Sequence, residues 1–159
     1  MRRLRLCLTL VGNLADPERS IMPITVAETM TPNPTTVRAD QTVREVAQLM
    51  DAQDIGNVVV VDGGRVVGIV TDRDIVVRVI AAGGGPDDEI RRACSTELVT
   101  ASPDDPVDAV VQLMRDKAVR RVPVMRGDEL VGIVSLGDVA MEHEPDSALA
   151  EISAEPPNE

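Results

Sequence analysis

Apolar residues along the chain follow a helical spacing and then an extended spacing, and this order occurs twice. In the first instance four residues recur on one face of a predicted amphipathic helix: Val43, Val46, Ala47 and Met50. The continuous β-branched run Val58–Val61 is typical of a strand buried on both faces. Asp62-Gly63-Gly64 is a turn signal, and Val66–Val70 is predicted to form the returning strand.

The same pattern returns 64 residues later without a gap, so that residues 29–75 correspond to residues 93–139. The second helical face comprises Val107, Val110, Val111 and Met114, and the second hairpin joins residues 122–125 to residues 130–134. A copy of about 60 residues is marginal for independent stability, so the pair is the expected folding unit. The repeat therefore predicts a two-fold unit in which each copy covers the apolar face of the other.

The ends of the predicted helices carry recognisable signals. Thr42 and Glu45 form a capping box at the first helix. In the second copy Asp105 is the expected cap, and Pro106 suits the first helical position. Pro123 cannot donate a ladder hydrogen bond, so its strand is expected at a sheet edge or with that side free.

The predicted order is a short helix, strand, helix, strand, strand and helix, occurring twice, which is an α/β (α+β) fold. A second helix is expected to begin near Thr71 in one copy and near Ser135 in the other. The linker Gly83-Gly84-Gly85-Pro86 ends the first copy, and a short helical segment over residues 87–94 leads into the second. The expected divisions are therefore residues 22–84 and residues 85–142.

The two ends of the chain differ in composition from the repeats. Residues 1–21 begin with a basic stretch and a short apolar run, which indicates an upstream extension or misassigned start, or alternatively a secretion signal. Residues 143–159 are acidic and contain no lysine or arginine, so a solvated, disordered tail is expected.

Composition and charge narrow the classes of function. The net charge of −11 opposes binding to nucleic-acid phosphates, and without Phe, Tyr or Trp the chain has no aromatic platform for stacking bases. Cys7, Cys94 and His143 are too few for a structural zinc site, and no metal or cofactor is expected. No nucleophile–base pair is apparent either, which argues against an enzyme. We expect a cytoplasmic protein with no membrane partner.

The motif Gly-Ile-Val-[Thr/Ser]-x-x-Asp occurs in both copies where a strand meets a helix. In one interpretation Thr71 and Ser135 are helix caps, and Asp74 and Asp138 stabilise the first turn. In the other interpretation the same hydroxyl and carboxylate bind a phosphate or a ribose. The motif alone does not separate these two interpretations.

The tandem copies, the Gly68–Asp74 junction and the Val119–Val124 segment resemble a CBS-domain pair, also called a Bateman module. The resemblance extends over about residues 25–142, and the chain also looks like the stand-alone CBS-pair proteins of the hypoxic-response type. It implies two repeats packed about a pseudo-two-fold axis, with clefts between them that can hold adenine nucleotides such as AMP, ADP or ATP. A role in stress response follows from the same likeness.

The resemblance also implies roles for individual residues. Asp74 and Asp138 would contact ribose, with Thr71 and Ser135 near ribose or phosphate. Arg120 and Arg121 are the candidates for phosphate, whereas the first copy has Gly56-Asn57 at the corresponding positions. The base would be enclosed by residues near the first and second strands: Thr36, Val37, Ile55 and Val58 in one copy, and Thr100, Ala101, Val119 and Val122 in the other.

The sequence is consistent with two functions. The first is a non-enzymatic regulatory module that senses an adenosine-containing ligand, and the second is a structural or interaction protein of the same fold without a nucleotide. A homodimer is expected, because the apolar faces of the helices after Thr42 and Pro106 exceed what three short strands can cover. The resemblance implies that such helices pack against a second module in a disc-shaped, isologous homodimer.

Overall fold

The fold is taken from a computed structural model that describes residues 23–95, 97–143 and 148–154. The interpretations of residues 1–21 lie outside the described residues. The expected disorder of the C-terminal tail is wrong for one segment, because Ala148–Ala154 forms helix α6, which contacts α5.

Both copies contain the predicted helix and hairpin, displaced by the repeat of 64 residues. The first copy comprises β2 (Thr36–Arg38), α2 (Val43–Gln53), β3 (Asn57–Asp62), β4 (Arg65–Thr71), α3 (Asp72–Asp74) and the π-helix η1 (Ile75–Ile80). The second comprises α4 (Val107–Lys117), β5 (Arg121–Arg126), β6 (Glu129–Ser135) and α5 (Leu136–His143). Short elements precede each copy: α1 (Val26–Thr29) and β1 (Thr31–Pro32), and the 3-10 helix η2 (Ile90–Ala93).

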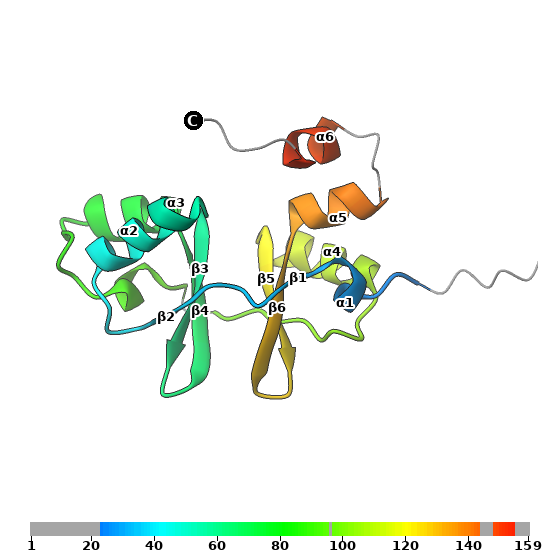
Figure 1. The fold of residues 1–159 in the computed structure, drawn as a ribbon, viewed down its shortest axis with the longest axis horizontal. Coiled ribbons are helices and arrows are strands. Elements are labelled where there is room, and N and C mark those ends of the chain that lie inside the picture. The colour runs from blue at the N-terminus through cyan, green and yellow to red at the C-terminus, as the bar shows by residue number, and fades with distance from the viewer. Residues whose placement is uncertain (1–22, 96, 144–147, 155–159) are drawn as a thin grey trace, which may run out of the picture.

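The chain forms two three-stranded sheets, with strand orders β2-β3-β4 and β1-β6-β5. In Figure 1 the two sheets stand side by side in the middle of the molecule, with helices above and to either side and both hairpin turns at the bottom. This is the expected arrangement of two repeats related by a pseudo-two-fold axis.

The segments that lead into the copies pack against the opposite copy. β1 precedes the first copy but pairs with β6 of the second, and Val26 of α1 is buried in the second core. Conversely η2 precedes the second copy, while Ile90 is buried in the first core. Corresponding backbone bonds hold both crossings: Val43 N donates to Asp88 O at 2.9 Å, and Val107 N donates to Ile24 O at 2.9 Å.

Pro123 explains why the second copy has one strand fewer of its own. In the first copy Val59 N donates to Thr35 O at 2.9 Å, and β2 pairs with β3 over three residues. Pro123 occupies the position of Val59 and has no N–H, so the corresponding contact is a single bridge between Ala101 and Val124. β5 is thus an edge strand of its sheet, as the proline predicts.

The helix starts differ between the copies. At α2 the capping box is present: Glu45 N donates to Thr42 Oγ1 at 3.2 Å, and the Glu45 carboxylate accepts from Thr42 N at 2.7 Å. This backbone hydrogen bond lowers the pKa of Glu45 below its usual value. The prediction for α4 was wrong, because Pro106 adopts an extended N-cap conformation and the Asp105 carboxylate accepts from Ser102 N instead. The crossing segment at Ile24 satisfies the first N–H of α4 in place of a side chain.

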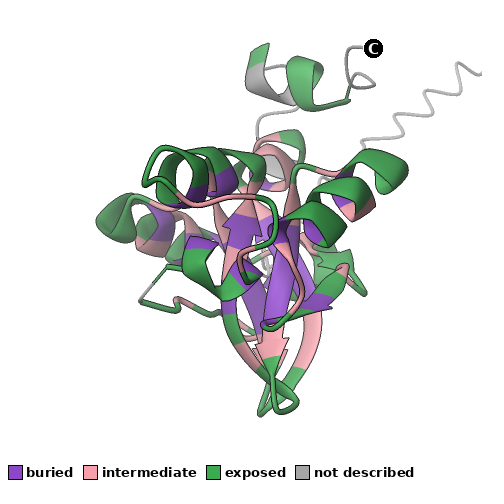
Figure 2. Ribbon diagram, turned by 90° about the vertical axis from the view of Figure 1, so that its left-hand side faces the viewer, coloured by how far each residue is buried: buried purple, intermediate pink, exposed green. Residues whose placement is uncertain are grey.

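The core is aliphatic and lies between each sheet and its helices, where Figure 2 shows the buried residues. The apolar faces of α2 and α4 are largely covered, since Val43, Val46, Met50 and their counterparts are buried. Ala47 is an exposed member of these predicted faces, and Val111 is partly buried. The part of the dimer prediction that rests on uncovered faces of α2 and α4 is therefore wrong. Large exposed apolar side chains lie instead mainly on η1, α5 and α6: Val76, Val77, Ile80, Leu136, Met141 and Ile152.

Candidate functional site

Two adjoining pockets lie between the copies on the side of Ser135 and Asp138, and together we call them the copy-two cleft. The smaller has a volume of about 280 Å³ and is lined by Thr31, Asn33, Pro34, Thr35, Ile55, Asn57, Arg121, Ile133, Ser135 and Asp138. The larger, of about 520 Å³, is lined by Asp72, Arg120, Arg121, Ser135, Leu136, Gly137, Asp138, Met141 and Ser153. Arg121, Ser135 and Asp138 line both pockets.

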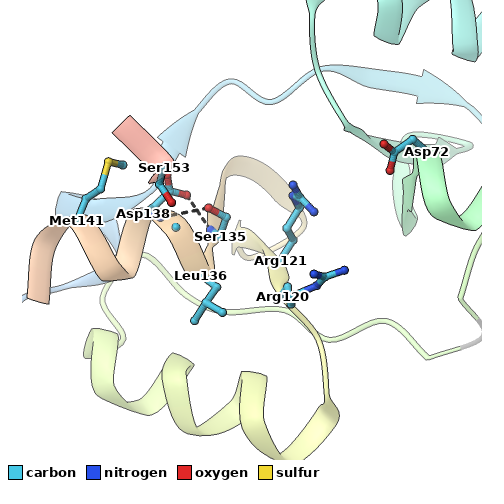
Figure 3. Close-up of a pocket in the computed structure, with 9 residues that line it drawn as sticks. Asp72, Arg120, Arg121, Ser135, Leu136, Asp138, Met141 and Ser153 are labelled. Carbon is cyan, nitrogen blue, oxygen red and sulfur yellow. Dashed lines mark hydrogen bonds between the residues drawn. The ribbon is translucent and has the colours of Figure 1, made fainter. Parts of the chain in front are cut away.

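Ser135 and Asp138 are positioned by the junction of β6 and α5. Ser135 N donates to Asp138 Oδ2 at 2.7 Å, and Asp138 N donates to Ser135 Oγ at 3.2 Å (Figure 3). This reciprocal pair satisfies the first turn of α5 and fixes the carboxylate at the cleft. A carboxylate has two oxygens, so Asp138 Oδ1 remains to accept hydrogen bonds from a ligand.

Cationic side chains reach the same cleft from the start of β5. Arg120 and Arg121 lie between the Ser135–Asp138 pair and Asp72 in the view of Figure 3. Arg120 is exposed and Arg121 is partly buried. Guanidinium groups present several N–H donors to phosphate oxygens, whereas a carboxylate accepts from neighbouring hydroxyls. The cleft thus combines groups for a phosphate and for a sugar.

The corresponding region of the first copy, the copy-one cleft, is smaller. Its pocket of about 60 Å³ is lined by Gly68, Ile69, Ser95, Glu97, Leu98, Val99, Val119, Arg121 and Pro123. An adjoining pocket of about 520 Å³ is lined by Arg78, Arg92, Cys94, Ser95, Glu97, Val99, Lys117 and Val119. Asp74 is absent from both linings, whereas its counterpart Asp138 lines both pockets on its own side.

Only some of the ligand-binding residues that the sequence analysis predicted line the two clefts. Ile55, Arg120, Arg121, Ser135 and Asp138 line the copy-two cleft, and Val119 and Arg121 line the copy-one cleft. Four others are buried within the two hydrophobic cores, behind the clefts: Val37, Val58, Ala101 and Val122. Thr36 and Thr100 are exposed, and Thr71 and Asp74 are bonded to each other, all outside these pocket linings.

Sequence reasoning missed the residues that the crossing of β1 brings to the cleft. Thr31, Asn33, Pro34 and Thr35 line it because β1 pairs with β6 of the other copy. Asn33 has φ +53°, a left-handed conformation that asparagine tolerates better than most residues. The sequence Pro32-Asn33-Pro34 between Thr31 and Thr35 is a turn signal that marks this segment as a loop.

Among residues 23–95, 97–143 and 148–154 no helix is long and apolar enough to cross a membrane. In the same part of the chain no three His, Cys, Asp or Glu side chains gather as metal ligands.

Comparison with known proteins gives one family. The CBS domain family model matches residues 26–81 and 89–143. The CBS domain-containing protein YhcV of Bacillus subtilis is 40% identical over 116 residues, which cover 73% of this chain and 83% of YhcV. Hypoxic response protein 1 of Mycobacterium tuberculosis is 34% identical, with 80% of this chain and 90% of that protein covered.

A solved structure agrees with these sequence relatives. The CBS domain pair of protein MJ0100, in complex with 5′-methylthioadenosine and S-adenosyl-L-methionine, superposes with a TM-score of 0.70 and 26% identity, over 79% of this chain and all of that one. The tandem repeat, the crossed leading segments and the family match over both copies lead to one conclusion: this chain belongs to the CBS-domain family and carries a pair of CBS domains.

Proposed function

We propose that the chain is a non-enzymatic regulatory module that binds an adenosine-containing ligand of the AMP, ADP or ATP class in the copy-two cleft. The observation that carries this proposal is the position of Asp138, which is fixed by Ser135 and lines both pockets together with Arg121. The carboxylate would accept ribose hydroxyls, and Arg120 and Arg121 would neutralise phosphate. The complex of MJ0100 with two adenosine-containing ligands supports this choice of ligand class.

The base would lie in the smaller pocket, where the lining is more apolar. Ile55 and Ile133 contribute aliphatic side chains, and Pro34 adds a third apolar surface. Aliphatic contacts on a purine are weaker than aromatic stacking, and this chain contains no Phe, Tyr or Trp. The polar groups of the ligand must therefore supply much of the affinity.

A structural or interaction role without a nucleotide is the second candidate. This candidate is favoured because helix capping alone accounts for the hydroxyl and the carboxylate at both strand-to-helix junctions, without any ligand. Thr71 and Asp74 bond each other, and so do Ser135 and Asp138, in the manner of capped helices.

Calorimetric titration of the purified chain with AMP, ADP, ATP, NAD and S-adenosylmethionine separates the two candidates. The sensing role predicts a saturable heat with at least one ligand, and affinity that falls as salt is raised, because the attraction between guanidinium and phosphate is screened. S-adenosylmethionine carries no phosphate, so its affinity would depend less on salt. Absence of binding to all five at millimolar concentration would leave the structural role.

We further propose a homodimer in which the exposed apolar side chains of η1 are covered. Val76, Val77 and Ile80 are 58%, 52% and 48% exposed, and adjacent exposed apolar residues mark interaction surfaces. Sedimentation at micromolar concentration should show twice the chain mass of 17.0 kDa. Val77→Asp should shift the chain to monomer, whereas Val67→Asp, on the 37%-exposed outer side of β4, should not. A wild-type monomer at these concentrations would contradict the dimer.

A further inference from the structure

Arg78 is held by three groups at the edge of the copy-one cleft. Its Nε faces Asp74 Oδ1 at 3.5 Å, one turn earlier on the same helical segment. Its Nη1 donates to Ala93 O at 2.9 Å and to Ser95 Oγ at 3.0 Å. The guanidinium thereby joins η1 to the segment that follows η2.

These contacts engage both oxygens of Asp74. Oδ2 accepts from Thr71 N at 2.9 Å and from Thr71 Oγ1 at 2.7 Å, while Oδ1 faces Arg78. Arg78 therefore competes with a ligand hydroxyl for Asp74 Oδ1. In the second copy the residue at the offset of 64 from Arg78 is Glu142, whose charge has the wrong sign to form this ion pair with Asp138.

The leading segments of the two clefts are also held in different ways. In the copy-two cleft Thr31 and Pro32 pair with Ile133 and Gly132 of β6, which keeps that segment along the sheet. Ser95 is the counterpart of Thr31, and it is bonded by Arg78 instead. Ser95 lies where the pocket of about 60 Å³ meets the adjoining pocket of about 520 Å³, and it lines both. Thr31 lines the pocket of about 280 Å³ that is next to Asp138.

We propose that Arg78 is a specificity-determining latch that withholds Asp74 from a ligand, keeps the inner pocket of about 60 Å³ in the copy-one cleft narrow, and so limits the chain to one adenosine ligand. This inference rests on the proposed function of the copy-two cleft. Arg78 acts in two ways: its guanidinium pairs with the Asp74 carboxylate, and its hydrogen bond to Ser95 Oγ holds Ser95 at the wall of the copy-one cleft. With only one open site, the binding curve for the ligand is a simple hyperbola. Two open sites of unequal affinity would give a biphasic curve.

The first test is the stoichiometry of nucleotide binding to the full chain by calorimetry with AMP. Wild type is expected to bind one AMP per chain, and Arg78→Ala is expected to bind two. Adding Asp74→Asn to Arg78→Ala should return the stoichiometry to one, since the newly opened site depends on that carboxylate. Arg65→Ala, which removes an exposed arginine at the β3–β4 hairpin, is the matched control and should stay at one.

The second test needs no ligand. Cys94 lies between Ala93 and Ser95, is partly buried, and contacts the backbone region of Gly68. Loss of the latch should free this segment, so iodoacetamide should alkylate Cys94 several-fold faster in Arg78→Ala than in wild type, as followed by peptide mass spectrometry. Arg78→Met keeps the apolar stem and provides the same readout if Arg78→Ala folds poorly.

The outcomes separate the latch from the proposed function. One AMP per chain in both wild type and Arg78→Ala would overturn the latch and leave the copy-two site intact. Two AMP per chain in wild type would also overturn it. If AMP does not bind at all, the proposed function fails for this ligand, and an unchanged alkylation rate of Cys94 would then overturn the latch separately.

Discussion

Asp138→Asn is expected to weaken adenosine nucleotide binding at least about tenfold while leaving the melting temperature nearly unchanged. The asparagine can still accept the hydrogen bond from Ser135 N, so the start of α5 remains capped. It loses the negative charge that strengthens the hydrogen bonds to ribose, and a hydrogen bond to a charged group contributes about 1.5–3 kcal/mol. A loss of about 1.4 kcal/mol corresponds to a factor of ten in affinity. Calorimetry and thermal melts measure the two quantities.

Asp74→Asn is the matched control for this experiment. The motif and the backbone capping contacts are the same, but Asp74 also accepts from Thr71 Oγ1, faces Arg78 and lies outside the linings of the pockets on its side. Its replacement should therefore change nucleotide affinity less than twofold. Equal losses in the two variants would contradict the assignment of the site to the copy-two cleft. Unchanged affinity in both would contradict the role of the junction carboxylates altogether.

Ile90→Ala is expected to cost about 2–5 kcal/mol of the free energy of unfolding, the usual range for truncating a buried isoleucine. Ile90 is fully buried, although it belongs to the leading segment of the second copy by sequence. Its side chain packs with Val43, Val46 and other residues of the first core, and its N–H donates to Gln41 O at 2.8 Å. A cavity there would weaken both the first core and the crossing that ties the copies together. Denaturant unfolding measures the change.

Ile152→Ala is the control, because it makes the same chemical change at a side chain that is 72% exposed. It should change the free energy of unfolding by less than about 0.5 kcal/mol, as is usual on a surface. If Ile90→Ala were as mild as the control, η2 would not be part of the first core. If it produced two separate unfolding transitions, the copies would be less coupled than their crossed segments indicate.

Much of the fold was predictable because its signals are local. The offset of 64 residues placed α2, β3 and β4 and their counterparts, since helical and extended spacings report which face of an element is buried. Thr42 and Glu45 marked the start of α2 because their hydrogen bonds span only three residues. At α4 the same reasoning was wrong, since Pro106 itself is the N-cap residue and the Asp105 carboxylate accepts from Ser102 N.

The candidate site was predictable only in part, for a related reason. Ser135 and Asp138 could be found because they lie at the junction that the motif marks. Arg120 and Arg121 could be found because they lie in the Val119–Val124 segment, where the family resemblance implies phosphate contacts. Val37, Val58, Ala101 and Val122 were named from their neighbourhood, but alternation along a strand turns such side chains into the core. Thr31 and Asn33 reach the cleft through pairing of β1 with a strand about 100 residues later, which no local pattern encodes.

The sequence by itself determined the repeat, the types of element, the aliphatic cores and the chemistry of the two junctions. These follow from periodicity, propensity and residue identity, which act over a few positions. Only the tertiary structure decided that the leading segments cross between the copies and that the two junctions are unequal. That inequality depends on where Arg78 and Arg120 reach in space, and long side chains meet partners that the sequence spacing does not fix. The copies are alike as sequences and differ as sites because packing, and not the motif, sets which carboxylate faces an open cleft.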